Sequence, residues 1–309
     1  MIKIKRILFL TDFSKCAEQA FLYAVFLAEQ TGAQLHMLHV NVLHAYDPNN
    51  PDYRFPEIDE SIQKKLDEAA AEHMKKKIKK MKVTGLDIKK VQQRGISAAP
   101  AILDYASDED VDLIVMGTHG RRGLGHLLLG SVAEEVVRRA DCSVLTVREE
   151  EEPRPQKDLE KFLVPLDFSG HSVKALGYAK EFAHKYGAGL QILHVIENQA
   201  SSIHYAIGMH TVMKINEEIQ EKVRDELKKA FKNAGGPDVP AKFYVTEGNA
   251  KKDIVEFAQK FRSDLIFIPS HGLSAIEELL LGSTTEKVVR HSVCPVFTVP
   301  AFGRSIVSE

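Results

Sequence analysis

The chain has 309 residues, which is enough for about two domains of ordinary size. Its 41 basic and 43 acidic residues leave a net charge of −2, and this near balance argues against a general nucleic-acid binder. A hydrophobic fraction of 44% and a charged fraction of 27% are typical of soluble globular proteins. No apolar run approaches the roughly 18 residues of a membrane span, so we expect no membrane partner.

Apolar runs of strand length alternate with helical patterns along the first half of the chain. In order, we expect a strand at 7–10, a helix at 14–30, a strand at 35–40, a helix at 59–81, a strand at 87–93, a helix at 100–108, a strand at 113–116, a helix from 131 and a strand at 143–147. The strands are short and rich in valine, isoleucine and leucine, as buried parallel strands are. Their alternation with helices predicts an α/β fold with a parallel sheet that is covered on both faces.

The second half of the chain repeats the first. Residues 7–40 align with residues 162–195 at a constant offset of 155, and residues 111–147 align with residues 263–299 at an offset of 152. Three residues have therefore been lost inside the second copy. A period of about 150 residues is far longer than the unit of a solenoid, which indicates a duplicated domain.

We expect a first domain at residues 1–148, a linker at 149–158 and a second domain at 159–309. The linker is rich in glutamate and contains Pro153 and Pro155, which bury little apolar surface and interrupt a helix. It is therefore expected to be an exposed connector between the two copies.

One loop of the first copy has the composition of a phosphate site. The segment GTHGRRGLGHLLLGS at 117–131 follows a predicted strand, and in open parallel sheets ligands bind beyond the carboxyl ends of the strands. Glycine backbones let N–H groups converge on an anion, and a helix that starts at Ser131 adds further donors. Arg121 and Arg122 add positive charge. The alternative is a tight turn at Gly117 and Gly120, with Ser131 as an ordinary helix cap.

Other nucleotide and catalytic signatures do not occur in the sequence. There is no P-loop, and the glycines at 120–125 are in the wrong order for a dinucleotide-binding turn. Kinase and α/β-hydrolase motifs are likewise missing.

Three features together resemble the universal stress protein family. They are Asp12 after the first strand, the sequence Leu-His-Val at 38–40, and a G-x2-G-x9-G-[ST] loop after the fourth strand. Both halves of the chain carry the resemblance, so the chain is similar to a tandem member of that family. The resemblance implies two doubly wound domains, each a five-stranded parallel sheet of order 3-2-1-4-5 with helices on both faces. It also implies the ATP-binding subclass for the first domain, with AMP or ADP as alternative ligands and Mg²⁺ as a candidate companion.

The resemblance also implies which residues of the first copy hold the nucleotide. Asp12 and the backbone of Val40 hold the adenine in this interpretation, although Asp12 has an alternative role as a cap of the following helix. The remaining expected site residues are Met116 and Gly117 near the ribose, and His119, Gly120, Arg121, Arg122, Gly130, Ser131 and Val132 around the phosphates. We expect His119 to make a backbone contact rather than to act in catalysis, because no carboxylate or nucleophile accompanies it.

The second copy departs from this pattern. Pro269 replaces the first glycine of the loop and has no backbone N–H. Leu273 and Ser274 stand where the first copy has arginines, and Glu277 and Glu278 add negative charge that would repel a triphosphate. The residues that persist define a weaker second site for adenosine or AMP: Asp167, Val195, Gly272, Gly282, Ser283 and Thr284.

Two functions fit these residues. The first is a non-enzymatic ATP-binding module of stress response or signalling, and the alternative is a slow ATPase or a self-phosphorylating enzyme. Phosphoryl transfer needs metal ligands and a positioned base or nucleophile, and we identify no such carboxylate or base near Ser131. We therefore favour the binding module and assign no catalytic residue. Turnover of labelled ATP that disappears in Gly120→Ala and Gly130→Ala variants would favour the enzyme.

The histidines and cysteines suggest no metal site and a reduced, cytoplasmic environment. His36 and His39 lie three apart on a predicted strand and face opposite sides of the sheet, so they cannot share an ion. The cysteines, at positions 16, 142 and 294, are too few and too scattered for a disulfide framework or a zinc site. The first apolar run is interrupted by Asp12 without a small-residue cleavage site, which argues against a signal peptide.

We expect the two domains to pair as a pseudo-symmetric dimer, with a further homodimer as an additional candidate. Each copy ends in an apolar strand, at 143–147 and at 293–299, and the implied order places this strand at a sheet edge. Exposed apolar edges favour pairing, and a tethered partner is present at high effective concentration. Small-angle X-ray scattering should therefore detect one compact particle, whereas two independently moving lobes would contradict the pairing.

Overall fold

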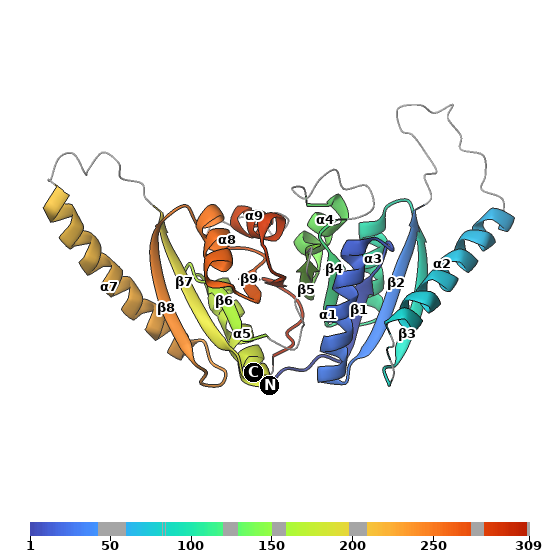
Figure 1. Ribbon diagram of the computed structural model, residues 1–309, viewed down its shortest axis with the longest axis horizontal. Helices are drawn as coiled ribbons and strands as arrows, with labels where there is room; N and C mark the ends of the chain where they lie inside the picture. Colours follow the sequence, from blue (N-terminus) through green and yellow to red (C-terminus); the bar gives the residue numbers. More distant parts are fainter. Residues whose placement is uncertain are drawn as a thin grey trace, which may run out of the picture. The chain divides into compact units, whose positions relative to one another are not determined.

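A computed structural model describes residues 1–42, 60–81, 83, 85–119, 129–149, 159–197, 209–272 and 281–307 (Figure 1). The chain divides into two compact units, Ile4–Gln156 and the combination of Met1–Lys3 with Lys157–Glu309. The segment around Pro153 and Pro155 lies outside the described residues. Each unit is described below by itself.

The first unit is a parallel α/β domain, as the sequence predicts. Its described elements are β1 (Arg6–Leu10), α1 (Lys15–Thr31), β2 (Gln34–Val42), α2 (Glu60–Lys80), β3 (Ile88–Gly95), α3 (Ala98–Asp108), β4 (Leu113–Gly117), α4 (Ser131–Arg139) and β5 (Ser143–Val147). The strands follow the order β3-β2-β1-β4-β5, and every pairing among them is parallel. The α/β fold and the implied strand order are confirmed for this unit.

The second unit repeats this architecture. Its described elements are β6 (Lys161–Pro165), α5 (Gly170–Tyr186), β7 (Gly189–Glu197), α7 (Met209–Asn233), β8 (Ala241–Gly248), α8 (Ala250–Phe261), β9 (Leu265–Pro269), α9 (Ser283–His291) and β10 (Val296–Val299). The order β8-β7-β6-β9-β10 is the same order with the second copy's strands, and its pairings are also parallel.

The chain reverses direction across the first sheet between β1 and β4. It runs outward from β1 to β2 and β3, and then returns to β4, which pairs with β1 through Ile7 and Leu113. Right-handed crossovers in opposite directions place α1 and α2 on one face of the sheet and α3 and α4 on the other. The central strands are buried on both sides as a result, with Leu8 and Ile114 fully inaccessible to solvent.

Helix caps and strand-start hydrogen bonds recur at equivalent positions of the two copies. Ser14 caps α1 by accepting the N–H of Ala17 at 3.2 Å, and Ser169 caps α5 by accepting the N–H of Ser172 at 3.1 Å. The carboxylate of Asp112 accepts two backbone N–H groups at the start of β1, and Asp264 does the same at the start of β6. These carboxylates and caps fix how each strand and helix begins.

The first three residues pack with the second unit. The N–H of Lys3 donates to the carbonyl of Ile306 at 2.7 Å, and Ile2 forms an antiparallel bridge with Val307. Nothing in the repeat alignment points to this arrangement, because the alignment starts only at residue 7.

Within the described part of the chain, no helix has both the length and the apolar character that a membrane crossing requires.

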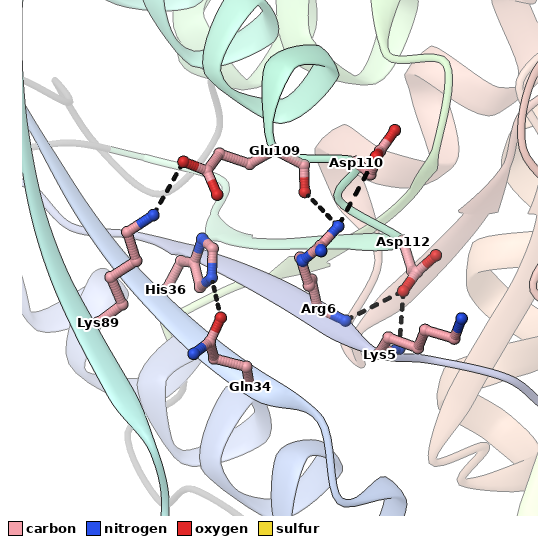
Figure 2. Close-up of polar contacts among 8 residues, drawn as sticks. All are labelled: Lys5, Arg6, Gln34, His36, Lys89, Glu109, Asp110 and Asp112. Atoms are coloured by element: carbon pink, nitrogen blue, oxygen red, sulfur yellow. Dashed lines mark hydrogen bonds and ion pairs between the residues drawn. The ribbon is translucent and has the colours of Figure 1, made fainter.

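His36 is a buried, hydrogen-bonded residue of β2 at the end of the sheet opposite to the expected site. Its Nε2 lies 2.7 Å from the side-chain oxygen of Gln34, and its Nδ1 lies 2.9 Å from the hydroxyl of Tyr105. Figure 2 shows the charged groups around it, including the Lys89–Glu109 ion pair at 2.8 Å. Burial, followed by the ammonium of Lys89, lowers the pKa of His36 below its usual 6.5. The imidazole is therefore held neutral.

Replacing His36 with glutamine, which the second copy carries as the buried Gln191, should reduce the acid sensitivity of the first domain. Because the pKa of His36 is lowered in the folded state, the unfolded chain binds the proton more readily as the pH falls through 6.5. The stability that the neutral ring supplies above this pH is thus lost below it. Urea unfolding at about pH 7.5 and about pH 5.5 should show a larger loss of stability in the wild type than in His36→Gln. Equal losses would contradict this role.

Candidate functional site

The carboxyl ends of β1 and β4 bring two of the expected site segments together. Asp12 follows β1 by two residues, and Gly117 is the last residue of β4, which pairs with β1. The backbone just beyond each strand is held by a hydrogen bond to the neighbouring strand. Thr11 donates its N–H to Leu38 O, and Thr118 donates its N–H to Val147 O, each at 2.9 Å. The reversal between β1 and β4 makes this the switch point of the sheet, where open α/β folds bind ligands.

Asp12 serves the turn that leads into α1. Its Oδ1 accepts the N–H of Ser14 at 3.0 Å, whereas the cap of α1 is Ser14 itself, so Asp12 supports the cap residue and is not the helix cap. A carboxylate has about four acceptor positions, so one such bond does not use up its capacity. Asp12 is half-buried. Val40 is also half-buried and lies near the carboxyl end of β2, the strand that pairs with β1.

Gly117 is required by the packing of α1 against β4. A Cβ atom at this position would lie 2.8 Å from Cys16 Sγ and 3.3 Å from the backbone nitrogen of Ala17. The thiol of Cys16 is buried and donates to Val147 O at 3.2 Å, and its burial raises its pKa. The glycine therefore has a packing reason that is independent of any ligand. Met116, one residue earlier, is buried within the sheet and only 5% exposed.

The N-terminus of α4 lies beside the end of β4 and has no side-chain cap among the described residues. Gly130 is its N-cap residue, so Ser131 is the first helical residue and does not act as an ordinary cap. The N–H of Gly130 donates to Thr118 O at 2.8 Å, and a Cβ atom on Gly130 would lie 3.2 Å from that oxygen. The first bond inside the helix runs from Glu134 N–H to Gly130 O at 2.9 Å, so the first-turn N–H groups, including that of Val132, point out of the helix.

Not all expected residues fall within the described chain. Gly120, Arg121 and Arg122 lie outside the described residues, as do Leu273, Ser274, Glu277 and Glu278 of the second copy. His119 is described, and its Nδ1 lies 2.7 Å from the hydroxyl of Thr118. The same pair recurs as His271 and Ser270 at 2.8 Å. Within the described ranges, no three His, Cys, Asp or Glu side chains gather as they would around a metal ion.

The second copy keeps the backbone of the site with different side-chain bonds. Asp167 accepts both the N–H and the hydroxyl of Ser169, at 3.0 and 2.6 Å, and its second oxygen would lie 2.8 Å from a Cβ on Gly272. Gly282 donates to Ser270 O at 2.9 Å and precedes α9, for which no described residue supplies a side-chain cap. Ser283 begins that helix, and Thr284 and Val195 are half-buried. Pro269 is the last residue of β9.

Comparison with known proteins assigns the family. Residues 3–148 match the universal stress protein family, and residues 159–300 match it again. The chain belongs to the universal stress protein family. A universal stress protein of Thermus aquaticus is 39% identical over 145 residues, which is 47% of this chain and 98% of that protein. The duplication also has parallels: a universal stress protein of Synechocystis is 27% identical over 317 residues, covering 96% of this chain and 99% of the relative.

A solved universal stress protein structure supports the tandem fold. The protein from Archaeoglobus fulgidus aligns with a TM-score of 0.66 at 22% identity, covering 96% of this chain and 98% of that one. The universal stress protein described here is thus a tandem member, as the sequence resemblance implies.

A Gly117→Ala substitution should lower the free energy of unfolding by about 1–3 kcal/mol, because the new methyl group would overlap Cys16 Sγ. Adding Cys16→Ala should recover part of this loss, since the sulfur atom is the nearest obstacle. Gly170→Ala is the control, because a Cβ there meets no atom within 4 Å. Urea titrations of the wild type, Gly117→Ala, Cys16→Ala and the double variant measure the coupling, and Gly170→Ala is titrated beside them. An identical cost of Gly117→Ala with and without Cys16 would contradict the packing role.

Proposed function

We propose that this tandem universal stress protein binds an adenine nucleotide, chiefly ATP, at the carboxyl edge of its first domain. The observation that carries the proposal is the uncapped N-terminus of α4 beside the end of β4, next to the strand that Asp12 follows. The nucleotide would act as a signal, because a ligand that prefers one conformation stabilises that conformation and can change which partner binds.

The phosphates would bind at the first turn of α4. Unpaired N–H groups and the positive end of the helix dipole favour anions at this position. The exposed Ser131 adds a hydroxyl donor, and Gly130 lets the loop close on Thr118 O at 2.8 Å. Arg121 and Arg122 belong to the same loop in the sequence and would supply positive charge. Mg²⁺ remains a candidate companion of the phosphates.

The adenine would bind between Asp12 and the backbone of Val40. Adenine has an exocyclic amine that donates to a carboxylate, whereas hypoxanthine carries an oxygen at that position and would be repelled. A site with a carboxylate directed at that amine discriminates against the analogue, because its own acceptor is left without a donor. Gly117 and the backbone of Met116 would lie beside the ribose.

Binding should be asymmetric between the two copies. The second copy retains Asp167 and the uncapped start of α9, but Pro269 lacks an N–H and no arginine occurs in its loop sequence. Asp167 also accepts two hydrogen bonds from Ser169. We propose a weaker adenosine or AMP site there. Binding without turnover is the activity that we propose for the first copy.

Isothermal titration with ATP should show about one tight site per chain, at least tenfold tighter than any second one. Gly130→Ala combined with Ser131→Ala should remove the tight site, because the new Cβ at residue 130 presses on Thr118 O and the phosphate donors shift. The matched pair Gly282→Ala with Ser283→Ala should leave the tight site in place. Two equal sites, or loss of the tight site in both double variants, would contradict the proposal.

A further inference from the structure

Two phenylalanines hold an unusual backbone conformation at equivalent positions of the two copies. Phe13 has φ 65° and Phe168 has φ 64°, in the left-handed region that bulky side chains avoid. Such strain persists only where the surrounding structure enforces it. Each phenylalanine directly follows the aspartate of the candidate site, so the strained turn sets the direction of Asp12 in one copy and of Asp167 in the other.

In each copy, one histidine contacts both the residue before the aspartate and the residue after it. We call this arrangement the brace; it is formed by His39 in the first copy and by His194 in the second. In the first copy, His39 Nδ1 donates to the carbonyl of Thr11 at 2.7 Å, and its ring packs on Phe13 with centroids 4.6 Å apart. Thr11 precedes Asp12 and Phe13 follows it, so a single side chain fixes both neighbours of the carboxylate. Phe13 also contacts His73 of α2, with ring centroids 5.1 Å apart.

The second copy carries the same brace. His194 Nδ1 donates to the carbonyl of Leu166 at 2.7 Å, and its ring lies 4.8 Å from that of Phe168. The residue before the aspartate is threonine in one copy and leucine in the other, whereas the bond to its carbonyl is unchanged. The histidine–carbonyl bond therefore does not require a particular side chain before the aspartate, although in the first copy Thr11 Oγ1 also accepts the N–H of Phe13 at 3.1 Å.

His39 also precedes Val40 in β2. The proposed adenine contacts are the carboxylate of Asp12, after β1, and the backbone of Val40, in β2. The His39–Thr11 bond connects the residue before one contact to the residue before the other, and so fixes the spacing between them. The positions of two hydrogen-bonding groups must be fixed to within about 0.5 Å if they are to distinguish one base from another.

We infer that His39 is the positioning residue for adenine recognition, acting through the turn at Asp12 without touching the nucleotide. This inference rests on the proposed function of the first domain. The hydrogen bond between His39 and Thr11 determines which base is accepted. The phosphate donors of α4 supply affinity that is common to all nucleoside triphosphates.

The test compares ATP with ITP by titration calorimetry in the full chain. His39→Phe keeps an aromatic ring beside Phe13 and removes the bond to Thr11 O. His39→Asn offers an amide N–H in place of Nδ1–H and should restore most of that bond. Asp12→Ala shows the loss of preference that follows when the carboxylate is removed. His194→Phe makes the same change in the second copy and is the matched control for general destabilisation.

Wild-type protein should prefer ATP over ITP. His39→Phe should reduce this preference about tenfold, the equivalent of one well-placed hydrogen bond, while ITP affinity is largely retained. His39→Asn should recover most of the preference, and His194→Phe should leave it unchanged at the tight site. If His39→Phe fails to fold, Phe13→Gly tests the brace from its other side, because glycine adopts φ 65° without strain and removes the ring. It too should lower the preference.

Three results would overturn the inference. An unchanged ATP preference in His39→Phe, or in Phe13→Gly where that variant replaces it, would show that the brace does not set base recognition and would leave the proposed function intact. An equal reduction by His39→Phe and His194→Phe would mean a general loss of stability. A wild type that binds neither nucleotide would overturn the proposed function, and this inference with it.

Discussion

The reversal of strand order between β1 and β4 determines where the candidate site lies. The chain leaves β1 in one direction and returns to β4 from the other, which makes the carboxyl ends of these two strands the switch point of the sheet. Side chains and backbone donors from distant parts of the sequence meet there. Asp12 comes from one side, and the start of α4, tied to Thr118 by Gly130, comes from the other. The strands that lead to these ends are buried in the core.

The two copies share a backbone frame and differ in the groups placed on it. The helix caps, the strand-start carboxylates and the histidine brace recur with nearly equal distances. Gly117 and His36 of the first copy correspond to Pro269 and Gln191 of the second, so the second copy has a proline in place of the tightly packed glycine and an amide in place of this buried imidazole. The two copies have thus kept the same backbone frame while the side chains at these positions diverged.

The sequence predicts much of this architecture because its signals are local. Alternating apolar runs, the matching halves and an aspartate after a strand led to the fold, its duplication and the placement of Asp12. Other features depend on contacts between distant segments. The closeness of Gly117 to Cys16 requires knowing that α1 packs on β4. A left-handed Phe13 has no signature in the sequence, because phenylalanine rarely adopts it. The pairing of Lys3 with Ile306 joins the two ends of the chain and follows from no periodic pattern.

We propose that an adenine nucleotide binds at the carboxyl ends of the strands of the first copy. Hydrogen–deuterium exchange with ATP, at a concentration that saturates only the tighter site, tests it most directly because it reports both binding and place. If the nucleotide binds there, exchange should be slower at the turn after β1, residues 11–14, and at the start of α4, residues 130–134. The matching segments of the second copy, residues 166–169 and 282–286, should exchange as before. Protection confined to the second copy, or no protection at either edge, would contradict the account.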